Sequence, residues 1–358
     1  MLTYKRMRVS FPQNHEINVL SHSREDDALW RMLVNRSPSP DIYFRPEYLR
    51  VSETLGDGKT VALVCNCDSL RVLCPLMVRR EPRVSDAFTP YGYGGLLLLS
   101  SAPATSEGVF RILECIRQWC NSERLVCCVL RMHPLLADRF CLSGLNNANF
   151  IVRKHGETIA LDLTQWNTIH QRIATLKKGR ISDLSSARKS LSAIIVDELD
   201  GVREYLPIFR DIYEQTMQRL QASAFYRFPE SYYAGLVEKM GIHLMLALAR
   251  FQNRFVGGSL FFYDSKFLHY HLSGTTMEGL KLKAPTLLVN QAADWARTRG
   301  CQWLHLGGGN HFKDGLYNFK ASFGGAVFPY TYVTIIADHR RYNTLIERAE
   351  AIWPYVPN

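Results

Sequence analysis

"HLGGGNHFKDGLYNFKASFGG" (residues 305–325) joins the end of an apolar, strand-like run to three consecutive glycines and then to a short helix-like run. Glycine has no Cβ atom, so its backbone can approach another group more closely than the backbone of any other residue. We therefore expect the backbone at Gly307, Gly308 and Gly309 to lie close to a ligand.

The helix-like run carries one lysine among apolar side chains. Asp314 suits an N-cap, and a helix that begins there brings four side chains to one face: Leu316, Phe319, Lys320 and Phe323. A charge on an apolar face is unfavourable unless the side chain extends to water or meets an anion. Lys320 is thus a candidate for binding an anion. The alternative is a surface lysine whose alkyl stem covers the core.

Length and composition indicate a globular protein of two domains. A chain of 358 residues is long enough for two domains that each bury a core, and 47% hydrophobic with 21% charged residues is ordinary for such proteins. We find no apolar run of about 18 residues, which a membrane span requires, and no secretion signal at the start of the chain. These features predict a cytoplasmic protein, and a monomer is natural if the two domains cover each other's sheets.

Charge and cysteine content bear on partners and metals. The formal net charge of +10 favours an anionic partner such as a nucleic acid or a phosphorylated substrate, although many basic proteins bind neither. The nine cysteines cannot all be paired with one another, and they lack zinc-like spacing. We expect reduced, buried thiols and no metal site.

The same order of elements, strand–strand–strand–helix–strand, is predicted twice. The first set covers residues 60–70, 71–80, 88–99, 106–123 and 125–132. The second set covers residues 243–251, 255–264, 266–275, 284–300 and 301–309. This repetition predicts an α/β protein (α+β in arrangement) of two tandem domains related by duplication, with mixed sheets flanked by helices. The predicted domains are residues 1–150 and 151–325, and the strand and helix predicted within 326–358 are expected to pack on the first domain.

Further helices are predicted at residues 166–190, 199–220 and 229–241. The first of these carries a dense run of positive charge at Lys177, Lys178 and Arg180. It is a candidate for contact with a nucleic-acid backbone, and a solvated helix surface is the alternative.

The motifs of several enzyme classes are absent: there is no G-x-S-x-G, H-E-x-x-H, P-loop or dinucleotide-binding G-x-G-x-x-G sequence. The order of elements resembles the GNAT superfamily of acyl-CoA N-acyltransferases. In that superfamily a Q/R-x-x-G-x-G/A loop holds the CoA pyrophosphate at a helix N-terminus. The matching stretch, "SGTTMEGLKLKAPTLL" (residues 273–288), lacks this loop, and Pro285 removes a backbone donor where the loop needs one.

A narrower resemblance is to the Fem branch of this fold, whose members transfer amino acids from aminoacyl-tRNA to an amine, typically of a peptidoglycan precursor. It is carried by "DIYFRPEYL", "PLMVRR", "TPYGYGG", "IYEQTMQRL…YRFPESYY", "YHLSGT" and "WLHLGGG…DGLYNFKASF", in that order, over roughly residues 40 to 330. The resemblance implies an aminoacyltransferase that needs no cofactor and uses aminoacyl-tRNA as co-substrate.

The resemblance also implies roles for individual residues. The Phe–Lys pair, Phe319 and Lys320, would be catalytic. The residues that would bind substrate are Arg45, Tyr91, Tyr93, Tyr213, Arg219, Tyr270, Ser273, Gly307, Gly308 and Gly309, and those that would contact tRNA are Lys177, Lys178 and Arg180. Ordinary strand tyrosines and solvated arginines are the alternatives for the substrate-binding set.

An aminoacyl ester is already activated, so an amine attacks it without ATP or a metal. The protein then has to position the reactants and stabilise the oxyanion, and a ribose hydroxyl beside the ester is able to relay the proton. His269, His271, His305 and His311 are candidate bases, with structural roles as the alternative. The acceptor stays open between a peptidoglycan precursor and a peptide or natural-product intermediate. Two rival hypotheses are an acyl-CoA-dependent (or carrier-dependent) N-acyltransferase and an RNA-binding protein with a degenerate transferase fold.

Overall fold

The computed structural model of the chain describes residues 7–11, 15–67, 70–81, 85–309 and 313–347. Two compact units are present: unit 1 is Met1–Gly156 with Pro329–Asn358, and unit 2 is Glu157–Phe328. Both boundaries fall inside strands, β8 (Phe150–Asp162) and β14 (Ala326–Ile336), so no linker composition marks them. The sequence-based boundaries at 150/151 and 325/326 lie a few residues away. No helix in the described ranges is both long and apolar enough to cross a membrane.

Unit 1 contains a mixed sheet. In spatial order its strands are β1 (Met7–Phe11), β2 (His15–Leu20), β3 (Lys59–Cys67), β4 (Leu70–Arg80), β5 (Ser85–Phe88), β7 (Cys127–Arg131) and β14, with the short β6 (Leu97–Leu98) paired to β4. Neighbours are antiparallel except β5 and β7. The described part of this unit has four α-helices: α1 (Arg24–Arg36), α2 (Pro46–Ser52), α3 (Ser106–Ser122) and α11 (His339–Glu347).

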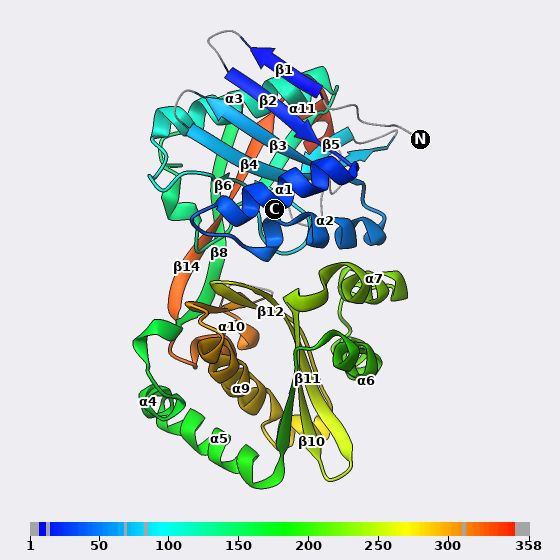
Figure 1. The fold of residues 1–358 in the computed structure, drawn as a ribbon, viewed down its shortest axis with the longest axis vertical. Helices are drawn as coiled ribbons and strands as arrows, with labels where there is room; N and C mark the ends of the chain where they lie inside the picture. The colour runs from blue at the N-terminus through cyan, green and yellow to red at the C-terminus, as the bar shows by residue number, and fades with distance from the viewer. Residues whose placement is uncertain (1–6, 12–14, 68–69, 82–84, 310–312, 348–358) are drawn as a thin grey trace. The chain divides into compact units, whose positions relative to one another are not determined.

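Helix α3 forms because its apolar residues recur at helical spacing and Thr105 caps its first turn. Val109, Leu113 and Ile116 are fully buried against one face of the sheet, where alternate residues of β3 meet them. Helices α1 and α2 lie on the other face (Figure 1). The nine cysteines are free thiols in this structure, and all except Cys141 are buried.

Unit 2 contains a second mixed sheet. In spatial order its strands are β8, β13 (Trp303–Gly307), β12 (Phe267–Thr275), β11 (Arg254–Asp264), β10 (Leu244–Phe251) and β9 (Ser192–Val196). Neighbours are antiparallel except β12 and β13. Its helices are α4 (Ile169–Thr175), α5 (Lys178–Ser190), α6 (Leu199–Arg219), α7 (Glu230–Gly235), α8 (Met277–Lys281), α9 (Ala284–Thr298) and α10 (Gly315–Ala321).

The helices of unit 2 divide between the two faces of the sheet (Figure 1). Helix α9 is buried on nearly all sides, because the sheet covers one side and α4, α5 and α10 pack on the others. Helix α6 packs on the opposite face, against β10, β11 and β12. Strands β12 and β13 pair only over Phe267–His269 and Trp303–His305, so the later residues of both strands lie beyond their shared ladder.

The predicted repetition is confirmed. In each unit three strands precede a helix and a strand parallel to the third: β3-β4-β5-α3-β7 in unit 1 and β10-β11-β12-α9-β13 in unit 2, with the short β6 and α8 lying before the respective helix. A further antiparallel strand follows in each sheet, β14 beside β7 and β8 beside β13. The prediction of a mixed α/β protein built from two similar units is therefore correct.

Two predicted elements differ from the structure. Residues 88–99 do not form one strand: β5 ends at Phe88, and the chain turns through Gly92 (φ 96°), where a Cβ atom would lie 2.3 Å from the Tyr43 ring. The predicted helix 166–190 is two helices, because Leu176 and Lys177 adopt extended ψ angles of 150° and 145°. Helical periodicity continues across this break, so sequence pattern alone did not reveal it.

Candidate active site in unit 2

Lys320 is the best-defined element of the candidate site. Asp314 caps α10 by accepting a hydrogen bond from the Tyr317 amide (2.7 Å), as predicted. Six residues later the Lys320 side chain is only 8% exposed. Its Nζ donates to the Gly308 carbonyl at 2.7 Å and lies 5.7 Å from the centroid of the Tyr270 ring. The lysine therefore points into unit 2 rather than along its surface.

The charge of Lys320 responds to this burial. Removal from water lowers the pKa of the ammonium to about 8, and the carboxylate of Asp314 partly opposes the shift. The side chain is therefore mostly cationic at neutral pH and loses its proton at mildly alkaline pH. An ammonium has three N–H donors, and the Gly308 carbonyl takes one of them.

The predicted residues Tyr270 and Ser273 lie on β12 beyond the segment paired with β13. Ser273 Oγ is 3.1 Å from Ser259 Oγ of the neighbouring strand β11. Burial raises the pKa of the Tyr270 hydroxyl, and hydrogen bonds with Ser273 and Ser259 oppose the increase. Lys320, Tyr270 and the two serines thus provide a cation and three hydroxyls from three elements. Sequence reasoning missed Ser259, since only strand register brings it opposite Ser273.

Gly307 ends β13, and Gly308 and Gly309 follow it. Gly307 has a φ of 74°, which glycine adopts without strain, and a Cβ atom at Gly308 would lie 2.6 Å from the Glu157 carbonyl oxygen of β8. The close approach expected at Gly308 is therefore to the neighbouring strand. Gly308 also offers its carbonyl to Lys320, and the partly exposed Gly309 follows it.

The side chains predicted to share one face of α10 are not all buried. Phe319 packs edge-on against Phe323, with ring centroids 5.1 Å apart, and Phe323 is 1% exposed. Leu316, by contrast, is 39% exposed, whereas its neighbour Tyr317 in the same turn is buried in the core of unit 2. Lys320, in the second turn, is buried where it contacts Gly308 and the Tyr270 ring.

The three basic residues expected to contact tRNA differ in environment. Lys177 and Lys178 are exposed. The Arg180 side chain is 15% exposed and donates to Ser322, Thr286 and Asp183 within unit 2.

Tyr213 and Arg219 join α6 to β12. The Tyr213 hydroxyl donates to the Tyr226 carbonyl (2.9 Å), and Arg219 Nη1 donates to the Thr275 carbonyl (2.8 Å). A Cβ atom at Gly274 would lie 2.6 Å from Tyr213 Cα, so the helix and the strand pack at backbone distance. These two residues lie on the α6 face of the sheet, opposite α9 and α10.

The other predicted substrate residues, Arg45, Tyr91 and Tyr93, lie in unit 1. Tyr93 is 8% exposed, and the Arg131 guanidinium lies 4.8 Å from its ring centroid. Burial raises the pKa of Tyr93 to about 12, although Arg131 opposes the increase. The Tyr91 carbonyl accepts a hydrogen bond from the Tyr48 hydroxyl, and the buried Arg45 occupies the N-cap of α2.

Three of the four candidate histidines, His269, His271 and His305, are buried and contact other side chains. The Nδ1 atoms of His269 and His305 are 3.1 Å apart, and His271 Nε2 is 2.7 Å from the Tyr232 hydroxyl. Burial holds the pKa of His271 well below its usual value, so this imidazole is neutral. These contacts do not decide between a base and a structural role, and His311 lies outside the described residues.

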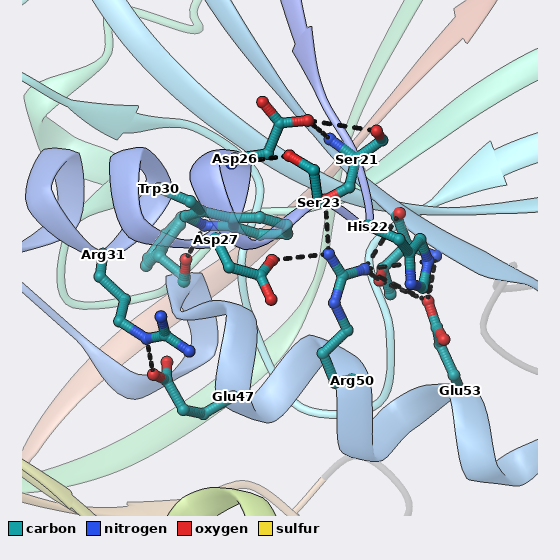
Figure 2. Close-up of polar contacts among 12 residues, drawn as sticks. Ser21, His22, Ser23, Asp26, Asp27, Trp30, Arg31, Glu47, Arg50 and Glu53 are labelled. Carbon is teal, nitrogen blue, oxygen red and sulfur yellow. Dashed lines mark hydrogen bonds and ion pairs between the residues drawn. The ribbon is translucent and has the colours of Figure 1, made fainter. Parts of the chain in front are cut away.

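A polar cluster in unit 1 was also missed by sequence reasoning (Figure 2). The Arg50 guanidinium of α2 donates to Asp27 of α1 (2.8 Å) and to the Thr60 carbonyl of β3 (3.3 Å). Burial raises the pKa of Glu53, but hydrogen bonds with His22 (2.8 Å) and Thr60 outweigh it and hold the pKa at about 2. The cluster joins two helices to the sheet, which is a structural role.

The GNAT fold implies an acyl-CoA substrate, whose pyrophosphate would be held by amides at the N-terminus of α9. Here α8 is inserted between β12 and α9. The amides of Lys283, Thr286 and Leu287 donate to chain carbonyls, and Pro285 has no amide hydrogen. The residues present therefore do not form the usual pyrophosphate site.

Comparison with known proteins agrees with this fold. Residues 177–321 match the family model of the acetyltransferase (GNAT) domain, a segment that runs from the start of α5 to the end of α10. No curated protein matches the chain in sequence.

Three solved structures share the fold at 12% sequence identity each. FemX has a TM-score of 0.69 over 90% of this chain and 98% of its own. A conserved protein of unknown function from Bacteroides thetaiotaomicron VPI-5482 has a TM-score of 0.59 over 87% and 97%. L-PGS from Bacillus licheniformis has a TM-score of 0.57 over 93% and 98%. The chain therefore has a Fem-like GNAT fold and carries an acyltransferase-type domain in unit 2.

Proposed function

We propose that the protein forms an amide bond by moving an amino acid from aminoacyl-tRNA to an amine, with Lys320 as the cation that stabilises the reaction's oxyanion. The observation that carries this proposal is the buried Lys320 ammonium between the Gly308 carbonyl and the Tyr270 ring. A desolvated cation is unfavourable for folding, and a catalytic role gives a reason to keep one.

The chemistry needs little more than such a cation. The acceptor nitrogen attacks the ester carbonyl carbon, and the carbonyl oxygen becomes an oxyanion. When the tetrahedral intermediate collapses, the carbon–oxygen bond to the ribose breaks, and the ribose oxygen takes up the proton that the nitrogen releases. A preorganised N–H donor in a site of low dielectric stabilises the oxyanion more than water does. The free N–H donors of the Lys320 ammonium fit this task, and Phe319 beside it is proposed to contact the donor.

Other residues are proposed to bind the two substrates. The hydroxyl of Tyr270, whose ring centroid lies 5.7 Å from Lys320 Nζ, and that of Ser273, which bonds to Tyr270, suit the polar aminoacyl end of the donor. Lys177 and Lys178 are exposed cations at the start of α5 and suit the tRNA backbone. The acceptor is proposed to be the amine of a peptidoglycan precursor or of a peptide or natural-product intermediate.

An acyl-CoA-dependent N-acyltransferase is the second candidate, because residues 177–321 match an acetyltransferase family model. The occupied amides and Pro285 at the start of α9 argue against it. Isothermal titration with acetyl-CoA discriminates between the two candidates: the proposal expects no tight binding, and tight binding would favour acyl-CoA as the donor.

The direct test combines the purified protein with a pool of charged tRNAs and candidate amine acceptors, and identifies the product by mass spectrometry. Treatment of the donor with RNase should abolish the activity. Lys320→Met should slow transfer by about 10²-fold or more, the scale of losing one oxyanion donor. Lys239→Met, at an exposed lysine of the same unit, is the matched control and should leave the rate unchanged. Product formation that survives RNase, or full activity of Lys320→Met, would contradict the proposal.

A further inference from the structure

Arg180 joins three helices around the candidate site. Its Nε and Nη2 donate to Ser322 Oγ, at 3.1 and 2.7 Å, directly after the end of α10. Its Nη1 donates to Thr286 Oγ1 in the first turn of α9 (2.7 Å) and to Asp183 one turn along α5 (3.0 Å). A planar guanidinium suits this arrangement because its donors form a rigid fork, which a lysine does not provide.

The same guanidinium covers the aromatic residues that flank Lys320. It lies 5.1 Å from the ring centroid of Phe319 and 5.0 Å from that of Phe323. The Ser322 hydroxyl, which accepts from Arg180, donates to the Phe319 carbonyl. Arg180 thus contacts the residue before Lys320 and the residues two and three positions after it.

Helix α10 depends on such contacts. An isolated helix of seven residues is unstable in water, so packing has to hold it in place. Asp314 caps its N-terminal end, and Arg180 bonds to the residue after its C-terminal end. Lys320 occupies the second-to-last position of the helix, near the end that Arg180 contacts.

A second arginine supports the same end of the helix. Arg172 is 2% exposed, donates through Nη1 to Asn290 of α9, and lies 6.0 Å from the Phe323 ring centroid. Burial lowers the pKa of this guanidinium to about 10. Placing two guanidiniums against the rings beside a buried ammonium is electrostatically unfavourable, and apolar side chains would fill the same space without that cost.

We infer that Arg180 is a positioning residue for the proposed transfer reaction, whose guanidinium holds the end of α10 against α9 and thereby sets the place of Lys320. The inference rests on the proposed function for its catalytic consequence. The geometric claim, that Arg180 orders α10, does not depend on the proposed function. Arg180 acts through α10, and Lys320 is the residue that meets the oxyanion.

The test compares Arg180→Gln, Arg180→Lys and Ser322→Ala with Arg188→Gln, a matched control at an exposed arginine of the same helix. We expect Arg180→Gln to lower kcat at least about tenfold with KM changed less than about twofold, because a lost charge-assisted hydrogen-bond network displaces Lys320 without removing a substrate contact. Arg180→Lys should rescue only partly, since it restores charge without the fork. Arg188→Gln should match the wild type.

A double-mutant cycle tests whether Arg180 and Ser322 act through their shared hydrogen bond. Arg180→Gln should cost less in a Ser322→Ala background than alone, because the two side chains share a bond. If Arg180→Gln does not fold, Ser322→Ala still removes the acceptor of two Arg180 donors and should lower kcat by itself. An unchanged kcat in Ser322→Ala, additive effects in the cycle, or a raised KM with an unchanged kcat would overturn the inference.

Hydrogen exchange separates this inference from the proposed function. In Arg180→Gln the backbone amides of residues 315–324 should exchange at least about tenfold faster than in wild type, while those of α6 should not change. If the wild-type protein transfers nothing from charged tRNA, the proposed function fails, and faster exchange at α10 still supports the positioning role. If exchange at α10 is unchanged, the positioning role fails whatever the protein's activity.

Discussion

Replacing Lys320 by methionine should make the protein more stable at neutral pH while slowing its transfer reaction. Methionine has a similar length and no charge, so the side chain fills the same space without a desolvated ammonium. Lys320 is 8% exposed, and burial lowers its pKa from 10.5 to about 8. That difference measures how strongly folding disfavours the charged form.

The magnitude follows from the two pKa values. A shift of 2.5 units corresponds to about 3 kcal/mol of destabilisation at pH 7, where the ammonium is charged in both states. The variant also loses the hydrogen bond to Gly308, which offsets the gain by about 1.5 kcal/mol. We expect a net stabilisation of about 1.5 kcal/mol, or an increase in Tm of about 3–6 °C for a unit of this size.

The pH dependence gives the prediction its sharpest form. The folded-state pKa lies below the unfolded value, so the unfolded chain binds more protons between pH 8 and pH 10.5, and wild-type stability rises with pH in this window. The stability of Lys320→Met does not rise in this window. The stability difference between the variant and the wild type, which favours the variant at pH 7, should therefore shrink to near zero by about pH 9.5.

Urea unfolding at both pH values, with Lys239→Met as the exposed control, measures the difference. A Lys320→Met protein that is less stable at pH 7, by a margin that does not change with pH, would refute the reasoning, since Lys320 would then not be a buried cation.

Three other outcomes are expected. The transfer rate should fall as pH rises above about 8, because Lys320 loses the proton that makes it an oxyanion donor; a rate that rises through this range in pH-jump assays would instead indicate a lysine base. Glu53→Gln should destabilise the protein by about 1–2 kcal/mol at pH 7, after allowance for solvent screening. The wild type should lose this stability as pH falls from about 4.5 to 2, whereas the variant has none of it to lose. Acid-unfolding curves that superimpose for the two proteins would contradict this. Gly274→Ala should destabilise by about 1–3 kcal/mol, because its Cβ would meet the Tyr213 backbone at 2.6 Å; an unchanged unfolding midpoint would show that α6 moves away without cost.

Sequence pattern was most informative where the cause of a structure is local. The Asp314 cap and most of the predicted strands depend on neighbours in the chain, and both are confirmed. The pattern was less informative where tertiary contacts replace local preference. Residues 88–99 are largely apolar like a strand, but the chain turns there at Gly92, which has a φ of 96° and packs on the Tyr43 ring. The break between α4 and α5 is likewise invisible in the periodicity of the sequence.

The candidate site shows the same division. An apolar setting for Lys320 was readable from its neighbours along the helix, and its burial agrees with that expectation. Ser259 was not readable, because strand register alone places it opposite Ser273. The contacts of Arg180 were not readable either, since they join residues of three helices that are far apart in the chain.

By itself, the sequence determined that two similar sets of strands and helices follow each other and that one lysine sits among apolar residues after three glycines, because periodicity and capping act over a few residues. Only the tertiary structure decided that Gly308 packs on Glu157 and offers its carbonyl to Lys320, and that Arg180 holds the end of α10. The physical reason is that the pKa of a buried lysine and the position of a short helix depend on groups brought together by folding rather than by adjacency in the chain.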